Sequence, residues 1–150
     1  MLFAKWRLRW SKPRFGNVKV NKALVLIHMK NEKIDTLSND IHLLLSKVTP
    51  HYDLINIIEN GKPEQDTTYC LSPGKEKNRI RFPQESSMII NLTNLLNDQL
   101  EWEVNKIQAP VKIRFDRNYV KFYNFIFLSE KADVMGKLAY FTKMTDKLMI

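Results

Sequence analysis

Residues 18–50 read VKVNKALVLIHMKNEKIDTLSNDIHLLLSKVTP, and this stretch decides the fold class that the sequence predicts. It begins with a long strand over Val18–Met29, whose buried centre is the apolar run ALVLI. Asp35 or Thr36 can then cap a helix, and Pro50 ends it. Along this helix the apolar residues recur at helical spacing, as Ile34, Leu37, Ile41, Leu44, Leu45 and Val48.

Shorter elements follow. Asp53–Glu59 predicts a buried strand, closed by the turn pair Asn60-Gly61. Lys62–Asn78 is polar and predicts a long loop with a short edge segment at Thr67–Leu71. Arg79–Phe82 then predicts a strand that ends at a proline.

The middle of the chain leaves two interpretations open. The apolar residues of Ser86–Leu100 fit either a helix or a buried strand. Just after it, Leu100, Trp102 and Val104 alternate with Glu101 and Glu103, which favours a strand with both carboxylates on one exposed face.

The last third predicts a hairpin and a helix. Val111–Phe115 alternates, Asp116–Asn118 is a turn, and Tyr119–Leu128 is a strand rich in aromatic residues. Ser129 can cap a final helix with an apolar side of Val134, Leu138, Phe141 and Leu148. We therefore expect an α+β domain over residues 17–150, an antiparallel sheet with two main helices packed on one face.

All of the surplus positive charge lies at one end of the chain. Residues 1–31 hold eight Lys and Arg residues and no acid, and the first carboxylate is Glu32. The formal net charge of the whole chain is +8, so the remaining residues balance. Residues 1–16 therefore predict a basic arm that precedes the domain, and its basic and aromatic residues are Lys5, Trp6, Arg7, Arg9, Trp10, Lys12 and Arg14, with Phe3 and Phe15.

Cations beside exposed tryptophans suit a polyanionic surface, either lipid headgroups or a nucleic-acid backbone. With about 1 kcal/mol for each basic group near an anionic leaflet, the five basic residues of the arm supply roughly 5 kcal/mol. A solvated tail, or an edge strand that packs its tryptophans, is the structural alternative. A second basic patch, which is more simply a solvated strand face, comprises Lys112, Arg114, Arg117 and Lys121.

No constellation for catalysis or for a metal is visible. Cys70 is the only cysteine and has no base spaced to activate it, which also excludes an internal disulfide. His28, His42 and His51 lack metal-ligand spacing, so structural roles are expected. The four scattered glycines form no phosphate-cradling loop. We expect neither an enzyme nor a cofactor.

Nothing in the sequence predicts a secretion signal or a membrane span. Lys and Arg interrupt the first 15 residues, and the run ALVLI is far too short to cross a bilayer. The expected location is intracellular, in the cytoplasm or peripherally on a membrane.

The order of elements resembles the matrix proteins of rhabdoviruses and related negative-strand RNA viruses. Residues 18–54 are similar to their strand, turn and amphipathic helix, and NYVKFYNFIFLSEKADVMGKLAYF (118–141) is similar to their strand, acidic turn and helix. The arm has no Pro-Pro-x-Tyr motif, which departs from the pattern. The resemblance implies a non-enzymatic virion protein of the host cytoplasm that binds anionic membrane, self-associates and condenses the nucleocapsid.

Two other functions stay open at this point. In the first, the arm follows the phosphates of RNA or single-stranded DNA while its tryptophans stack on bases. In the second, the arm recognises an acidic protein partner.

Overall fold

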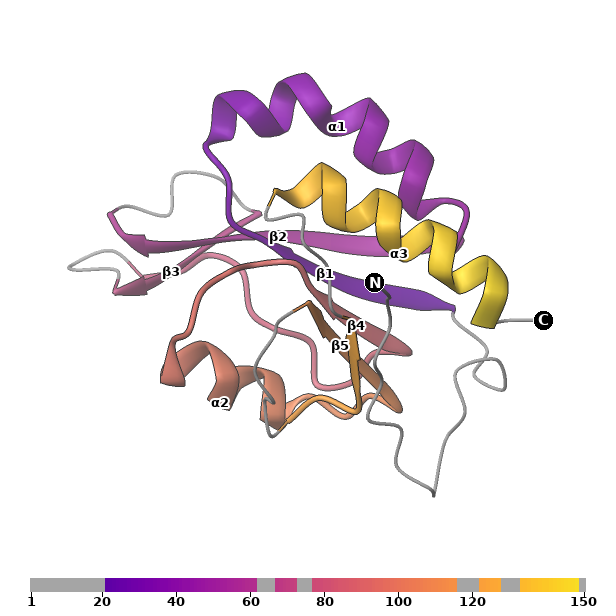
Figure 1. Cartoon of the computed structure of the whole chain (residues 1–150). Coiled ribbons are helices and arrows are strands. Elements are labelled where there is room, and N and C mark those ends of the chain that lie inside the picture. Colours follow the sequence, from indigo (N-terminus) through magenta and orange to yellow (C-terminus); the bar gives the residue numbers. More distant parts are fainter. Residues whose placement is uncertain (1–20, 62–66, 73–76, 116–121, 128–132, 149–150) are drawn as a thin grey trace.

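The computed structural model describes residues 21–61, 67–72, 77–115, 122–127 and 133–148. Within these ranges, six strands form one sheet and three helices cover its two faces (Figure 1). The strands lie in the order β3-β2-β1-β4-β5-β6, so the chain winds outward from β1 in both directions. This is the strand order of a doubly wound α/β fold.

The first unit is a strand, a helix and a second strand. β1 (Lys22–Ile27) leads into α1 (Asn31–Leu45), and β2 (His51–Asn60) then pairs with β1 in parallel. The helical spacing of the apolar residues of α1 places Ile41 and Leu45 in the core. The apolar stripe of α1 therefore lies against the sheet and its polar side faces water.

The second half of the chain builds the other side of β1. β4 (Met88–Asn91) pairs with β1, and α2 (Asp98–Lys106) connects it to β5 (Val111–Phe115). β6 (Phe125–Phe127) follows at the end of the sheet, and α3 (Val134–Leu148) comes after it. All of these strands run parallel to β1.

The helices lie on opposite faces of the sheet. Figure 1 shows α1 and α3 together on one face and α2 on the other. Side chains of β1 alternate between the two cores: Ala23, Val25 and Ile27 pack with α1 and α3, and Leu24 and Leu26 pack on the face of α2. Burial on both faces explains why β1 is apolar from Ala23 to Ile27.

β3 (Thr68–Ser72) forms one end of the sheet and its outer edge is closed by a side chain. It pairs in parallel with the second half of β2, beginning opposite Asn56. Gly61, whose φ is +119°, lies in the turn directly after β2. Asn78 accepts a hydrogen bond from the Cys70 N–H at 2.7 Å and donates to the Cys70 carbonyl at 2.9 Å. The amide thus imitates a neighbouring strand and satisfies backbone groups at the edge.

The expected antiparallel sheet is wrong, because every strand pair of the described sheet is parallel. Val111–Phe115 is not the first arm of a hairpin, since β6 runs beside β5 in the same direction. The sequence signal for parallel strands was the run of consecutive apolar residues in β1 and in β4, all of which are buried. Such runs are typical of parallel strands that helices cover on both faces.

Two further assignments are corrected. Leu100–Val104 lies in helix α2 and not in a strand, and the buried residues Leu100 and Val104 share one side of that helix. α2 is therefore a third helix, on the face opposite the two expected ones. Arg79–Phe82 is no strand, although Ile80 and Phe82 pack against the core beneath α2.

Other expectations are confirmed in place. The helix after β1 is present but begins at Asn31, before the expected caps, and the strands near 53–59 and 67–71 are β2 and β3. Ser86–Leu100 contains a strand, β4, followed by a loop and the first turn of α2. α3 buries Val134, Leu138 and Phe141. Ser129 and the boundary between arm and domain at residues 16 and 17 lie outside the described residues.

Candidate functional site

The candidate site is a cavity at the carboxyl ends of the central strands. β2 and β3 lie on one side of β1, and β4, β5 and β6 lie on the other, so the strand order reverses at β1. Open α/β sheets bind ligands at the carboxyl ends of the strands where this reversal occurs. A cavity of about 900 Å³ is lined here by residues 28–33 after β1, by Asn56 and Ile58 of β2, by residues 92–94 after β4 and by residues 133–134 at α3. Its volume lies in the range of small-molecule sites.

The wall formed by the β1–α1 loop is held in place by β2. The buried side chain of Asn56 accepts a hydrogen bond from the Met29 N–H at 2.9 Å and donates to the Met29 carbonyl at 2.8 Å. His28 Nδ1 lies 2.6 Å from the Ile57 carbonyl, so Nδ1 carries the proton and donates. These bonds fix residues 28–29 and thereby set where α1 begins.

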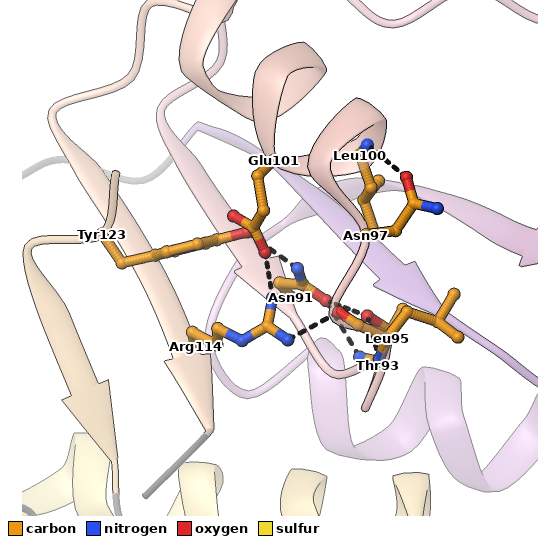
Figure 2. A network of polar contacts seen from close by, with 8 residues as sticks. All are labelled: Asn91, Thr93, Leu95, Asn97, Leu100, Glu101, Arg114 and Tyr123. Atoms are coloured by element: carbon orange, nitrogen blue, oxygen red, sulfur yellow. Dashed lines mark hydrogen bonds and ion pairs between the residues drawn. The ribbon is translucent and has the colours of Figure 1, made fainter. Parts of the chain in front are cut away.

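The wall formed by the β4–α2 loop is held from the α2 side by a buried cation. Arg114 of β5 is fully buried, forms an ion pair with Glu101 of α2 and donates from Nη2 to the Leu95 carbonyl at 2.7 Å (Figure 2). Its guanidinium carbon also lies 5.7 Å from the centre of the Tyr123 ring. The arginine therefore ties together β5, α2 and the loop.

Asn91 continues this network at the end of β4. Its Nδ2 donates to the Tyr123 hydroxyl at 2.8 Å, and its Oδ1 accepts from both the backbone N–H and the hydroxyl of Thr93, at 2.9 and 2.7 Å (Figure 2). Burial raises the pKa of the Tyr123 hydroxyl well above its ordinary value, with a smaller contribution from the Glu101 carboxylate. Tyr123 thus stays a neutral partner at pH values near neutrality.

A second buried cation holds the same loop from the opposite face. Lys137 of α3 is 2% exposed, and its ammonium donates to the Leu92 carbonyl at 3.0 Å and to the side-chain oxygen of Asn94. Leu92 and Asn94 both line the cavity. Residues 92–95 are consequently held between Arg114 on one side and Lys137 on the other.

The charges around the cavity differ between its two helix starts. At α3, the carboxylate of Asp133 accepts a hydrogen bond from the Gly136 N–H at 3.1 Å and so caps that helix. At α1, the cap residue Lys30 makes no side-chain cap hydrogen bond, and Lys33 adds a second cation beside Glu32. The start of α1 is thus the more electropositive of the two.

The structure describes only two of the basic residues predicted to bind an anionic surface, Lys112 and Arg114, and neither lines the cavity. Every arm residue, from Lys5 to Arg14, lies outside the described residues, as do Arg117 and Lys121. Lys112 and Arg114 do not form a solvated strand face: Arg114 is buried, and Lys112 is partly buried and donates from Nζ to the Val104 carbonyl at 3.0 Å. Burial also lowers the pKa of Lys112.

Cys70 and His42, also singled out from the sequence, have local structural partners. Cys70 is buried in β3 and not placed in a loop, and its thiol donates to the Gly61 carbonyl at 3.4 Å. His42 contacts the Tyr52 hydroxyl at 3.1 Å. Among the residues that the structure describes, no three His, Cys, Asp or Glu side chains gather as a metal site would require.

Sequence reasoning missed the residues that line the cavity. The available signal was the polar group that directly follows each buried strand, His28–Asn31 after ALVLI and Asn91–Asn94 after Met-Ile-Ile. In a parallel sheet such groups meet at one edge, so the parallel direction had to be recognised first.

The chain matches no protein-family model, no curated protein and no solved structure. In the described part of the chain, no helix combines the length and the apolar content needed to cross a bilayer.

Proposed function

We propose that the folded domain binds a small polar molecule in the cavity at the carboxyl ends of β1, β2 and β4. The observation that carries this proposal is the convergence of three strand ends and two helix starts on one cavity of about 900 Å³. Buried hydrogen bonds hold two of its walls, through Asn56 on one side and Arg114 on the other. Such a preformed site binds without a large cost in ordering its own side chains.

The lining has the mixed character of a small-molecule site. Ile58 and Val134 supply apolar surface and the exposed Asn94 supplies an amide, whereas Leu92 and Thr93 are buried in the wall. A ligand can therefore bury an apolar part and orient itself through a few polar contacts.

Filling the cavity tests this function. Ile58 is partly exposed and lines the cavity, so Ile58→Trp occupies part of the volume. The matched control is Leu43→Trp, at a position on α1 that is 61% exposed and outside the cavity lining. We expect members of a polar-metabolite library to shift the amide resonances of residues 28–33 and 92–94, and Ile58→Trp to abolish these shifts while Leu43→Trp retains them. Binding that is insensitive to Ile58→Trp, or a library without any shift at these amides, contradicts the proposal.

A second function is proposed for the basic arm of residues 1–16, supported by the eight basic and no acidic residues of the first 31 positions and by Trp6 and Trp10. The arm is proposed to bind an anionic surface, with lipid as the first candidate and single-stranded nucleic acid as the second. The viral matrix resemblance of residues 18–54 and 118–141 was to an antiparallel domain, whereas the described strand pairs are parallel, so this proposal takes no support from the folded domain. A matrix-like role in self-association and nucleocapsid binding stays a proposal that rests on the arm alone.

Vesicle and RNA binding separate the two polyanions. We expect vesicles that contain anionic lipid to pull down the intact chain and Trp6→Ala with Trp10→Ala to weaken this, whereas Trp102→Ala, at a 56% exposed position on α2, leaves it unchanged. Equal binding to neutral vesicles counts against lipid. Binding to single-stranded RNA with a steep salt dependence favours the nucleic-acid alternative.

A further inference from the structure

The start of α1 differs from the phosphate-binding turn of dinucleotide-binding domains. No glycine occurs between residues 17 and 60, so the turn of residues 28–31 carries a side chain at every position. In a dinucleotide site, glycines let the backbone approach the pyrophosphate closely. Here that approach is obstructed, and the two hydrogen bonds between Asn56 and Met29 and the one from His28 to the Ile57 carbonyl hold the turn in this form.

Side chains at this turn offer a different way to bind an anion. Lys30 and Lys33 both line the cavity and both are exposed, so each ammonium is accessible to a ligand. Glu32 also lines the cavity, which leaves one net positive charge in residues 30–33 before the helix contribution of roughly half a charge. Asp133, the other acid of the lining, is engaged in capping α3.

The opposite side of the cavity supplies neutral polar groups. Thr93 and Asn94 lie on the loop that Lys137 and Arg114 hold in place, and the apolar residues Ile58 and Val134 complete the lining. A molecule that spans the cavity therefore meets cations at one end and amide and apolar groups at the other.

We infer that the ligand is a small molecule with one anionic group, a phosphate or a carboxylate, which binds at Lys30 and Lys33, and that the site does not take a dinucleotide. This inference rests on the proposed function of the cavity. It deepens that function by naming the ligand class and the two residues that select it.

The test uses the full chain and four probes. Ribose 5-phosphate carries a phosphate at C5, ribonate is the open-chain acid with a carboxylate at C1, ribose is the neutral sugar, and NAD is the dinucleotide probe. Amide resonances of residues 28–33 report binding. We expect ribose 5-phosphate or ribonate to bind at least tenfold more tightly than ribose, and NAD to bind no more tightly than the better of these two.

Charge variants link the preference to the two lysines. Lys30→Gln with Lys33→Gln should weaken the anionic probes at least tenfold and leave ribose unchanged. Lys47→Gln with Lys106→Gln, two exposed positions outside this cavity, removes the same charge and should retain the binding of the anionic probes within twofold at physiological salt. The affinities for ribose 5-phosphate and for ribonate, compared with each other, tell whether the site prefers a phosphate or a carboxylate.

Four results overturn the inference. They are equal binding of ribose and its anionic relatives, unchanged binding in the Lys30 and Lys33 variant, tighter binding of NAD than of the better anionic probe, and silence of the cavity amides with all four probes. The proposed function is decided separately, by the library and the Ile58→Trp variant, so a neutral ligand found there would refute the anion and leave the binding site intact.

Discussion

Replacement of Arg114 by Met tests whether the buried network holds the loop between β4 and α2. The side chain is fully buried, and its contacts include the ion pair with Glu101, the hydrogen bond to the Leu95 carbonyl and the contact with the Tyr123 ring. Its removal leaves the Glu101 side chain, only 13% exposed, without this cation and takes one donor from the Leu95 carbonyl. Breaking a buried ion pair on one side costs about 3–5 kcal/mol.

That cost is large compared with the roughly 5–15 kcal/mol by which a domain is stable. Equilibrium unfolding in urea, followed by circular dichroism, measures it as a fall in the midpoint at unchanged slope. The surface pair Lys106–Glu103, 3.5 Å apart with a lysine 56% exposed, provides the control, and Lys106→Met should cost less than about 1 kcal/mol.

A double-mutant cycle separates the ion pair from the loss of packing. Arg114→Met with Glu101→Leu removes both charges. The loss of stability in this double variant should therefore be smaller than the sum of the losses in the two single variants, by about 2–3 kcal/mol. If Arg114→Met fails to fold, Glu101→Gln keeps the shape of the carboxylate and still tests the charge. A cost for Arg114→Met as small as that of Lys106→Met, or strict additivity in the cycle, would refute the reasoning.

Two further predictions concern the same walls and their pH dependence. Asn56→Asp removes the donor to the Met29 carbonyl and should lower the stability of the domain by about 1–3 kcal/mol. The Met29 amide should exchange its hydrogen faster in this variant than in the matched edge variant Asn78→Asp. Equal exchange of the Met29 amide in the two variants would contradict the role of Asn56. Burial raises the pKa of Tyr123 in the folded state, so the unfolded state releases its proton first and stability should fall as pH rises above about 10. Urea midpoints measured across this range should fall less steeply in Tyr123→Phe, and an identical slope would show that Tyr123 is not the group responsible.

Several elements could be predicted because their signals are local. The helical spacing from Ile34 to Val48 predicts α1, and the pair Asn60-Gly61 predicts the turn that ends β2, where Gly61 adopts a positive φ. Leu100 and Val104 show the limit of such signals. Residues four apart lie on one side of a helix and also on one face of a strand, so periodicity alone did not distinguish α2 from a strand.

The amino-acid order alone established which segments are apolar, where α1, β2 and the last helix lie, and that the positive charge is concentrated before Glu32. Strand direction, the partner of each strand and the position of the cavity were decided by tertiary structure, because hydrogen bonds between strands join residues distant in the chain and either direction satisfies them. Burial of Arg114 has the same origin. From the sequence alone, a charged residue between apolar neighbours is predicted to face solvent. Arg114 is buried instead because α2 brings the carboxylate of Glu101 to it.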